Sequence, residues 1–390
     1  MDRNRTIRRN EFVPFAKLKT YRLKNYNFRL VLLMLIICGL GIAVIGSAND
    51  GAGSNSAVIK QAVGMIIGFA GMVVISLIDY GWVLRFYWMI YVFNIGLLSA
   101  VLLIGDNHHG AQRWIDIGSS LTIQPSEFAK IFTILFFAKF LTVNKERLSK
   151  WWFIFLTAVL AGIPLLLIEK EPDLSTTILI TGLTIIMIFA AGISYKKIGI
   201  MLAVFIPVAA AAIIYIQQPE QKLLDQYQLN RINAFLYPDE YDDQRYQQDN
   251  SVLAIGSGRL YGKGLYNDST ESLKNANYLS REMVNDFIFA IIGEEMGFVG
   301  SCIVLGVLFL IIVECFLAAI FAPDMTGRMV CTGMAALLTL QVFINVGVAT
   351  ELLPNTGIPL PFISSGLSSL LSLFGGMGFV LNVSLQRTRN

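Results

Sequence analysis

One acidic residue, Asp286, lies where a polar stretch changes into a long apolar run. The polar stretch covers about 217–285 and is the longest in a strongly apolar chain. Asp286 opens the segment Asp286-Phe287-Ile288-Phe289-Ala290, in which the apolar run begins. A carboxylate at such a boundary can reach both water and a cavity within the membrane. It is therefore suited to act as a general base on a lipid-linked substrate with a water-facing headgroup.

A second set of polar residues opens another apolar run, Gln124-Pro125-Ser126-Glu127-Phe128-Ala129-Lys130. Pro125 is typical of a first helical turn. Glu127 and Lys130 are three residues apart, so they share a helix face and can form an ion pair. Two interpretations stay open: a structural pair that faces the bundle, or a face that lines an outward cavity and binds a polar substrate together with Gln124 and Ser126. Ionisable residues within a membrane favour the second.

Arg113 precedes this helix in the segment Gly110-Ala111-Gln112-Arg113-Trp114. It either stacks on Trp114 at the membrane interface or offers its planar guanidinium group to a phosphate. Together with Lys130, across one short outward loop, Arg113 would form a diphosphate site.

Asp173 follows Glu171-Pro172 and opens a further apolar run. It either caps that helix or joins Glu127 and Asp286 at a common outward mouth. Three converging carboxylates would raise at least one pKa or bind a divalent cation, Mg²⁺ or Mn²⁺. A histidine or cysteine metal centre is not expected, because the two histidines are adjacent and the four cysteines lack a CxxC motif.

Two irregular segments also contain candidate ligands. Residues 255–264 are rich in glycine and form either a flexible turn or a strip that lets Lys263 or Arg259 reach an anionic group, but they do not match a P-loop. Residues 357–366 contain two prolines and several small residues, including Ser364. Such backbone survives in a membrane only inside protein or beside water, so we expect it to form a wall of the same cavity, with Asn345 nearby.

The elements that must position these residues are membrane helices. Mean hydropathy is +0.62 and only 15% of the 390 residues are charged, which indicates an all-α polytopic membrane protein. Ten apolar runs predict about ten transmembrane helices, at 30–47, 61–78, 86–105, 125–143, 152–168, 174–193, 198–216, 286–320, 329–349 and 364–384. The run 286–320 is too long for one straight span and should tilt or break at Gly293, Gly297 or Gly300.

Basic residues set the expected orientation. Residues 1–29 form a basic tail and 385–390 a short second one, and the positive-inside rule places both in the cytoplasm. One membrane domain then covers 30–384, and the loop between the seventh and eighth spans, 217–285, is large and extracytoplasmic. We expect short amphipathic helices there, because the loop contains apolar patches.

Taken together, these segments resemble the SEDS family, which includes the RodA, FtsW and SpoVE proteins. Five segments spread over nearly the whole chain carry the resemblance: Gly110–Trp114 with Gln124–Glu127, Pro172–Leu174, Ala254–Gly264, Asp286–Gly297 and Gly357–Phe362. Three positions depart from the family pattern: Val284 stands where histidine is frequent, Ser175 where glycine is usual, and Ser365-Gly366-Leu367 where Tyr-Gly-Gly is common.

The resemblance implies a peptidoglycan glycosyltransferase of the bacterial cytoplasmic membrane that polymerises lipid II, with the family's essential carboxylate at Asp286. It also implies a single-pass class B penicillin-binding transpeptidase as a partner, within a larger cell-wall synthesis complex, and no nucleic acid. An elongation role is slightly preferred over division or sporulation.

Three other functions are weighed against polymerisation. A lipid II flippase would need ionisable residues in the cytoplasmic half of the spans, whereas these charges gather at the outer mouths. An ion-coupled transporter would show inverted repeats, and none is apparent in the sequence. A non-catalytic scaffold for a transpeptidase would not need Asp286.

Overall fold

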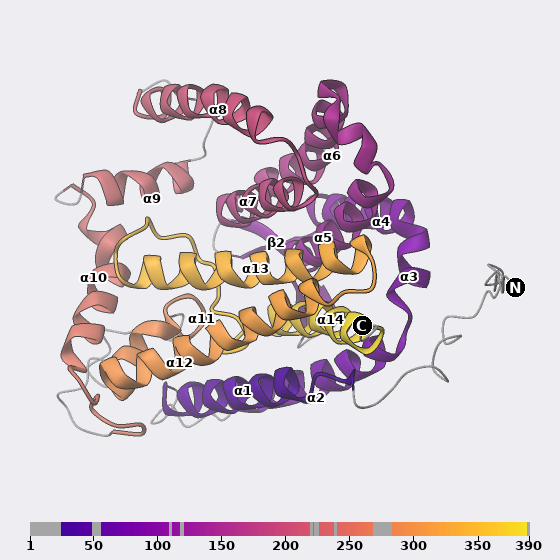
Figure 1. Ribbon diagram of the computed structural model, residues 1–390. Coiled ribbons are helices and arrows are strands. Elements are labelled where there is room, and N and C mark those ends of the chain that lie inside the picture. The colour runs from indigo at the N-terminus through magenta and orange to yellow at the C-terminus, as the bar shows by residue number, and fades with distance from the viewer. Residues whose placement is uncertain are drawn as a thin grey trace, which may run out of the picture.

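The computed structural model describes residues 25–48, 56–108, 111–117, 121–218, 221, 226–237, 240–267 and 283–387. Most of the predicted basic tail, 1–29, lies outside these ranges, as do residues 388–390. The described chain is mainly helical, and its long helices form a bundle (Figure 1).

Each of the ten apolar runs corresponds to a helix. The long helices are α1 (Phe28–Ala48), α2 (Ser56–Leu77), α4 (Tyr87–Ile104), α5 (Pro125–Val143), α6 (Trp151–Lys170), α7 (Leu174–Ala190), α8 (Tyr195–Ile216), α12 (Ile288–Ile320), α13 (Met325–Ala349) and α14 (Leu367–Leu385). Shorter elements are α3 (Tyr80–Val83), η3 (Leu84–Phe86), η4 (Lys145–Ser149), α9 (Gln226–Leu236), α10 (Asp242–Ser257) and α11 (Met283–Asp286).

Seven stretches of the described chain are long and apolar enough to cross a membrane. They are α1, α2, the stretch Tyr80–Ile104 that contains α4, α6, α12, α13 and α14. Helix α7 is apolar but shorter. The polytopic architecture is thus supported, while the count of ten spans stays a prediction.

The described residues between 106 and 123 form strands, so the expectation of an all-α chain is wrong for this segment. Strands β1 (Asp106–His108), β2 (Ala111–Ile117) and β3 (Leu121–Ile123) form an antiparallel sheet in the order β1-β2-β3. Ile115 pairs with Ile123 in its register. Two of the strands have three residues each, too few for an alternating pattern to be visible in the sequence.

Helices α13 and α14 form the centre of the bundle. In an apolar 18-residue stretch of each, 61% and 72% of the residues are buried, against 22% in the corresponding stretch of α2. Helix α14 packs on α2, α5 and α13, and α12 packs on α1 and α13. The peripheral helices leave large apolar side chains exposed, such as Leu103 and Phe155. A surface of this kind is suited to lipid and not to water.

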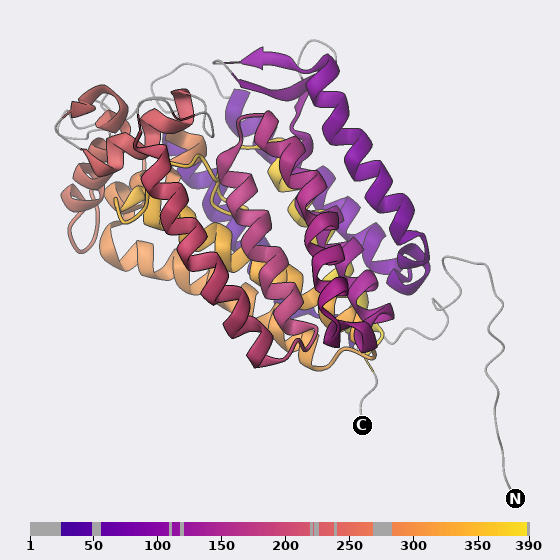
Figure 2. The same ribbon diagram turned by 90° about the horizontal axis from the view of Figure 1, so that it is seen from above.

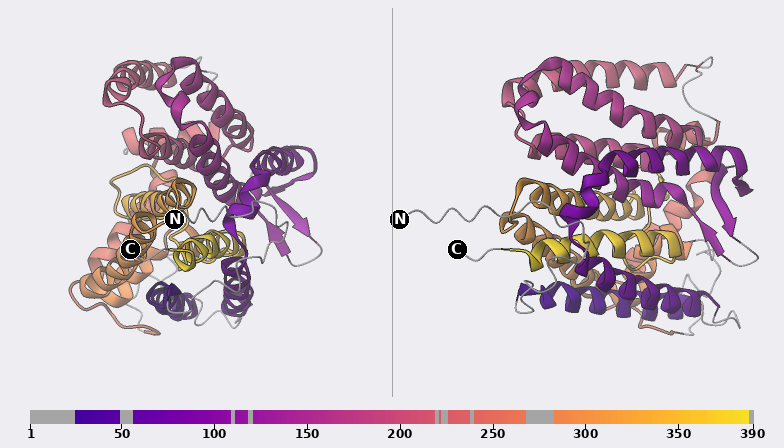
Figure 3. Two further views of the ribbon diagram at one scale, coloured as in Figure 1. Left: turned by 45° about the vertical axis from the view of Figure 1, so that its right-hand side comes forward. Right: turned by 90° about the vertical axis from the view of Figure 1, so that its right-hand side faces the viewer.

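The two ends of the bundle differ. The strands, α9 and α10 lie at one end, and the C-terminus lies at the other (Figures 2 and 3). We call the first the sheet end and the second the terminal end. Two short helices, α9 and α10, are present within 217–285. Helix α9 is amphipathic as expected, whereas α10, which packs on α12, is not.

Helix α12 contains the break predicted from its length, at Gly297, whose φ is 65° and ψ −165°. The turn that follows α10 fills the gap with backbone hydrogen bonds. Lys263 N donates to Glu294 O at 2.9 Å, and Phe298 N donates to Arg259 O at 2.9 Å. The break therefore leaves these groups satisfied, as a membrane environment requires. A Cβ at Gly262 would lie 2.2 Å from Glu295 O, so only glycine fits this approach.

We expect Gly262→Ala to lower the free energy of unfolding by about 1–3 kcal/mol more than Gly264→Ala, because the added methyl group meets backbone. Gly264 is the matched control, since its φ is also positive (95°) but its Cβ would meet nothing within 4 Å. Thermal unfolding of the full-length protein in detergent measures both. Equal melting temperatures would show that this contact does not hold the break.

Candidate functional site

Asp286 is the last residue of α11, and one residue, Phe287, separates it from the start of α12. Its backbone carbonyl accepts a hydrogen bond of 2.7 Å from Asn345 Nδ2 in α13. The same amide nitrogen donates to Ile358 O at 2.8 Å. Asn345 is 1% exposed, so this amide is a buried clasp between the start of α12 and the proline-rich segment.

The proline-rich segment passes close to the Asp286 carboxylate. Gly357 has a φ of 75°, and a Cβ built there would lie 3.2 Å from Asp286 Oδ2 and 3.6 Å from Arg231 Nη1. The backbone at 354–366 is non-helical, as the sequence predicted. Glycine at this position lets both a carboxylate and a guanidinium group approach the chain.

Four charged side chains act on Asp286. Burial raises the pKa of its carboxyl group to about 6; Arg231 and Arg113 oppose that rise, and Asp173 and Glu127 add to it. The sequence-predicted carboxylates and Arg113 thus lie within electrostatic range of Asp286. Such a raised pKa is typical of a general base that works near neutral pH.

Arg113 and Arg231 line one cavity of about 120 Å³ at the sheet end. Arg113 Nε donates to Glu171 O at 3.0 Å, and the guanidinium group also donates to Pro172 O. These carbonyl groups fix Arg113 against the loop between α6 and α7. The remaining lining includes Ser175, Gln228 and Thr356.

Glu171 is buried beside Arg113, and neither carboxyl oxygen has a hydrogen-bond partner among the described residues. Burial and the nearby Asp173 raise the pKa of Glu171 to about 9, and Arg113 only partly offsets this. Glu171 is therefore mainly uncharged at neutral pH. The sequence analysis assigned it no role.

Asp173 caps α7 and is also one of the charged residues that act on Asp286. We call Asp286, Arg113, Arg231, Asp173 and Glu127, with the Lys130 partner of Glu127, the charged cluster. Its carboxylate accepts from Thr176 N at 3.1 Å, which confirms the cap. The other carboxylate oxygen accepts from Ser126 Oγ at 3.4 Å, and Gln124 Nε2 donates to that hydroxyl at 3.1 Å. Three predicted site residues on two elements are thus brought together.

Glu127 and Lys130 form the predicted ion pair. Lys130 Nζ lies 2.7 Å from Glu127 Oε2, and the two residues are 1% and 4% exposed. In a buried pair of this kind, loss of either partner leaves the other without compensation, which is strongly destabilising. A direct contact of either with substrate stays a prediction.

The contacts described for Lys263 and Ser364 are with other parts of the protein and not with Asp286 or the charged residues around it. Lys263 Nζ pairs with Glu294 Oε1 at 2.9 Å. Ser364 Oγ accepts from Leu360 N at 2.8 Å within a buried turn. Their roles as substrate ligands stay predictions, and the glycine-rich strip itself docks on the α12 backbone.

The described residues contain no group of three or more His, Cys, Asp or Glu side chains that could hold a metal ion. Glu127, Asp173 and Asp286 therefore do not make a preformed metal site. A divalent cation held by fewer carboxylates together with other oxygen ligands stays a prediction.

Arg231 is the functional candidate that the sequence analysis missed. It lies on α9, in the long polar loop, where the sequence predicted amphipathic helices without indicating which polar residue turns inward. The only signal was a basic residue on an otherwise weakly charged amphipathic stretch.

Comparison with known proteins agrees with this geometry. Residues 24–389 match the family described as "Cell cycle protein", FtsW/RodA/SpoVE. The chain belongs to this family. It is 31% identical over 383 residues to a probable peptidoglycan glycosyltransferase FtsW of Trichlorobacter lovleyi, covering 94% of this chain and 95% of the relative. It is 32% identical over 369 residues to the peptidoglycan glycosyltransferase MrdB of Escherichia coli, covering 92% and 93%.

A solved structure extends the SEDS assignment to the fold. A chain from a study titled "Structural coordination of polymerization and crosslinking by a peptidoglycan synthase complex" superimposes with a TM-score of 0.76 at 24% identity, covering 94% of this chain and 99% of that one. The SEDS resemblance stated from five short segments is confirmed by the family match over residues 24–389, and this structure shows that the fold is shared.

We expect Asn345→Leu to lower the free energy of unfolding by about 1–3 kcal/mol, because two hydrogen bonds are lost and two carbonyl groups are left unpaired. Gln341→Leu is the matched control. Gln341 lies one turn earlier on α13, is fully buried, and its amide has no partner among the described residues. Thermal unfolding in detergent should show a loss for Asn345→Leu and none for Gln341→Leu. The same loss of stability in both variants would show that the two hydrogen bonds of Asn345 do not stabilise the fold.

Proposed function

We propose that this chain is a peptidoglycan glycosyltransferase that polymerises lipid II at the outer face of the bacterial cytoplasmic membrane. Two SEDS relatives of nearly full length carry that activity in their names. The observation that carries the proposal is the half-buried Asp286 carboxylate, with a pKa of about 6, between Arg113 and Arg231.

The sheet end is the outward side in this proposal, and both termini are cytoplasmic. Ten helices would span the membrane, with 217–285 as the large outer loop. The distribution of basic residues supports this orientation. Lys145 and Arg147 lie in η4, after the end of α5, and Lys196 and Lys197 lie at the start of α8, after the end of α7.

Asp286 would take the proton from the 4-hydroxyl group of the acceptor GlcNAc. That oxygen forms a bond to the anomeric carbon of the donor MurNAc, while the bond from this carbon to the diphosphate oxygen breaks. Undecaprenyl diphosphate leaves with the electron pair. A base with a pKa near 6 is ionised at neutral pH and still accepts a proton as the hydroxyl group becomes acidic in the transition state.

Cationic groups must stabilise the diphosphate that leaves. Arg113 and Arg231 are the nearest to the cavity, and Lys130 is the third cation of the cluster. Asp286, Asp173 and Glu127 balance these three charges when ionised. The cluster then has no net positive charge with which to stabilise the diphosphate. We therefore propose that Mg²⁺ or Mn²⁺ arrives with the diphosphate and takes its oxygens as ligands.

The proposed partner is a single-pass class B penicillin-binding transpeptidase that cross-links the new strand, in a larger cell-wall synthesis complex. A structural neighbour comes from a complex whose title joins polymerisation with crosslinking. We prefer an elongation role, while relatives at 31% and 32% identity carry division-type and rod-type names respectively.

We expect Asp286→Asn to lower the rate of glycan formation by about 10²–10⁴-fold, because an amide cannot accept the proton. The assay follows lipid II polymerisation by the purified protein with its transpeptidase partner. Glu146→Gln, an exposed carboxylate in η4, is the control and should keep full activity. Wild-type activity should fall with a chelator and return with Mg²⁺ or Mn²⁺.

Equal polymerisation by wild type and by a folded, partner-bound Asp286→Asn protein would exclude Asp286 as the base and point to Glu127 or Asp173. No polymerisation by either protein, with lipid II crossing vesicles, would favour the flippase. If the chelator leaves the activity of the wild type unchanged, the reaction does not require Mg²⁺ or Mn²⁺.

A further inference from the structure

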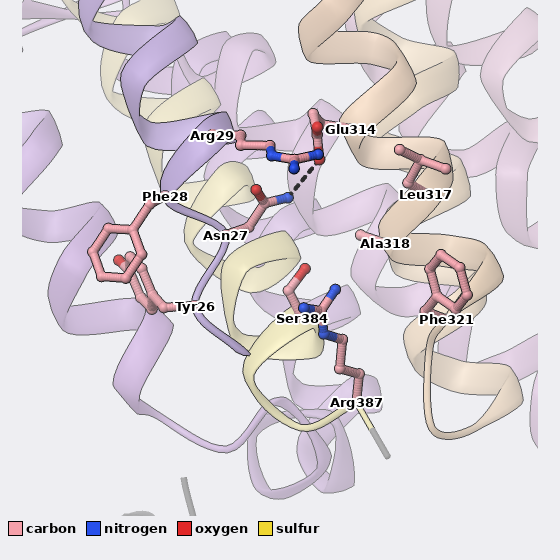
Figure 4. Close-up of a pocket in the computed structure, with 10 residues that line it drawn as sticks. All are labelled: Tyr26, Asn27, Phe28, Arg29, Glu314, Leu317, Ala318, Phe321, Ser384 and Arg387. Atoms are coloured by element: carbon pink, nitrogen blue, oxygen red, sulfur yellow. Dashed lines mark hydrogen bonds between the residues drawn. The ribbon is translucent and has the colours of Figure 1, made fainter. Parts of the chain in front are cut away.

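A second and larger cavity, of about 410 Å³, lies at the terminal end of the bundle, away from Asp286. It is formed where α1 begins and where α12 and α14 end (Figure 4). Its polar lining comes from Asn27, Arg29, Glu314, Ser384 and Arg387. None of these residues takes part in the site described above.

The cavity contains more positive than negative charge. Arg29 and Arg387 face it with two guanidinium groups, against the single carboxylate of Glu314. Asn27 Nδ2 donates to Glu314 Oε2 at 2.8 Å, so part of that carboxylate is already engaged. An anion that enters would meet both arginines.

Arg387 has a hydrogen-bond donor that a ligand in the cavity could use. Its Nε is buried and has no hydrogen-bond partner among the described residues. A buried N–H group without an acceptor is unfavourable unless a ligand or water supplies one. The planar guanidinium group is well matched to phosphate oxygens.

The edge of the cavity is apolar and faces outward. Phe28 is 62% exposed and Phe321 is 57% exposed, and both line the cavity next to Leu317. They lie at the ends of the apolar helices α1 and α12, at the depth where a membrane meets water. The cavity thus offers cations to a headgroup and apolar surface to the chains attached to it.

We propose that this cavity binds the headgroup of an anionic phospholipid, with the phosphate between Arg29 and Arg387 and the acyl chains along Phe28 and Phe321. In the proposed orientation the lipid belongs to the cytoplasmic leaflet, whose anionic lipids attract basic residues. The binding does not depend on the reaction at Asp286.

The test measures lipid retained by the full-length protein, using native mass spectrometry after exchange into micelles that contain phosphatidylglycerol or phosphatidylcholine. The wild type should prefer phosphatidylglycerol, and the double variant Arg29→Gln/Arg387→Gln should retain roughly tenfold less of it. Arg328→Gln removes the same charge from an exposed position at the start of α13, outside the cavity, and should change retention less than twofold.

Thermal unfolding and lipid II polymerisation establish that the variants are folded. Arg29→Lys/Arg387→Lys keeps the charge without the planar fork and should bind between the wild type and the glutamine variant. The proposal fails if the folded glutamine variant retains phosphatidylglycerol like the wild type, or if the wild type shows no preference over phosphatidylcholine. It also fails if glycerol phosphate competes as well as the lipid, since the cavity would then bind a soluble anion.

Discussion

Backbone hydrogen bonding inside a membrane is the constraint on which the rest of this structure depends. Any segment that is not a helix must find partners for its N–H and C=O groups within the protein. Two irregular segments meet this requirement, one against α12 and the other against α13. The turn at 258–264 bonds to the break in α12, and the segment 354–366 is tied to α13 and to Asp286 by Asn345. The site is built from these connections.

The position of Asp286 follows from that arrangement. Because α12 begins only after the clasp, its first residues lie at the sheet end, near strand β2 with Arg113 and helix α9 with Arg231. The carboxylate is thus placed in protein surroundings that favour its neutral form and beside cations that favour its charged form. The balance between these two effects gives a pKa near neutrality, and Glu171, with less compensation, stays protonated.

Much of this was predictable from the sequence, since the signals were local. A charge at the boundary of an apolar run marked Asp286, three-residue spacing marked the Glu127–Lys130 pair, and excess length marked the break near Gly297. Contacts between distant segments were not predictable. The pairing of Lys263 with Glu294 had no signal in the sequence, and Arg231 reaches the site only through the packing of α9. The short strands of the outer sheet had no periodic signal.

The pH dependence of lipid II polymerisation tests most directly whether Asp286 is the base. The rate should rise with pH through a midpoint of about 6, because only the ionised carboxylate accepts the proton. In Arg231→Gln the midpoint should move to higher pH, since a cation that lowers the pKa is lost, whereas Arg259→Gln, at an exposed position of the glycine-rich turn, should leave it unchanged. A profile that is flat between pH 5 and 8, or a midpoint that Arg231→Gln does not move, would contradict the account.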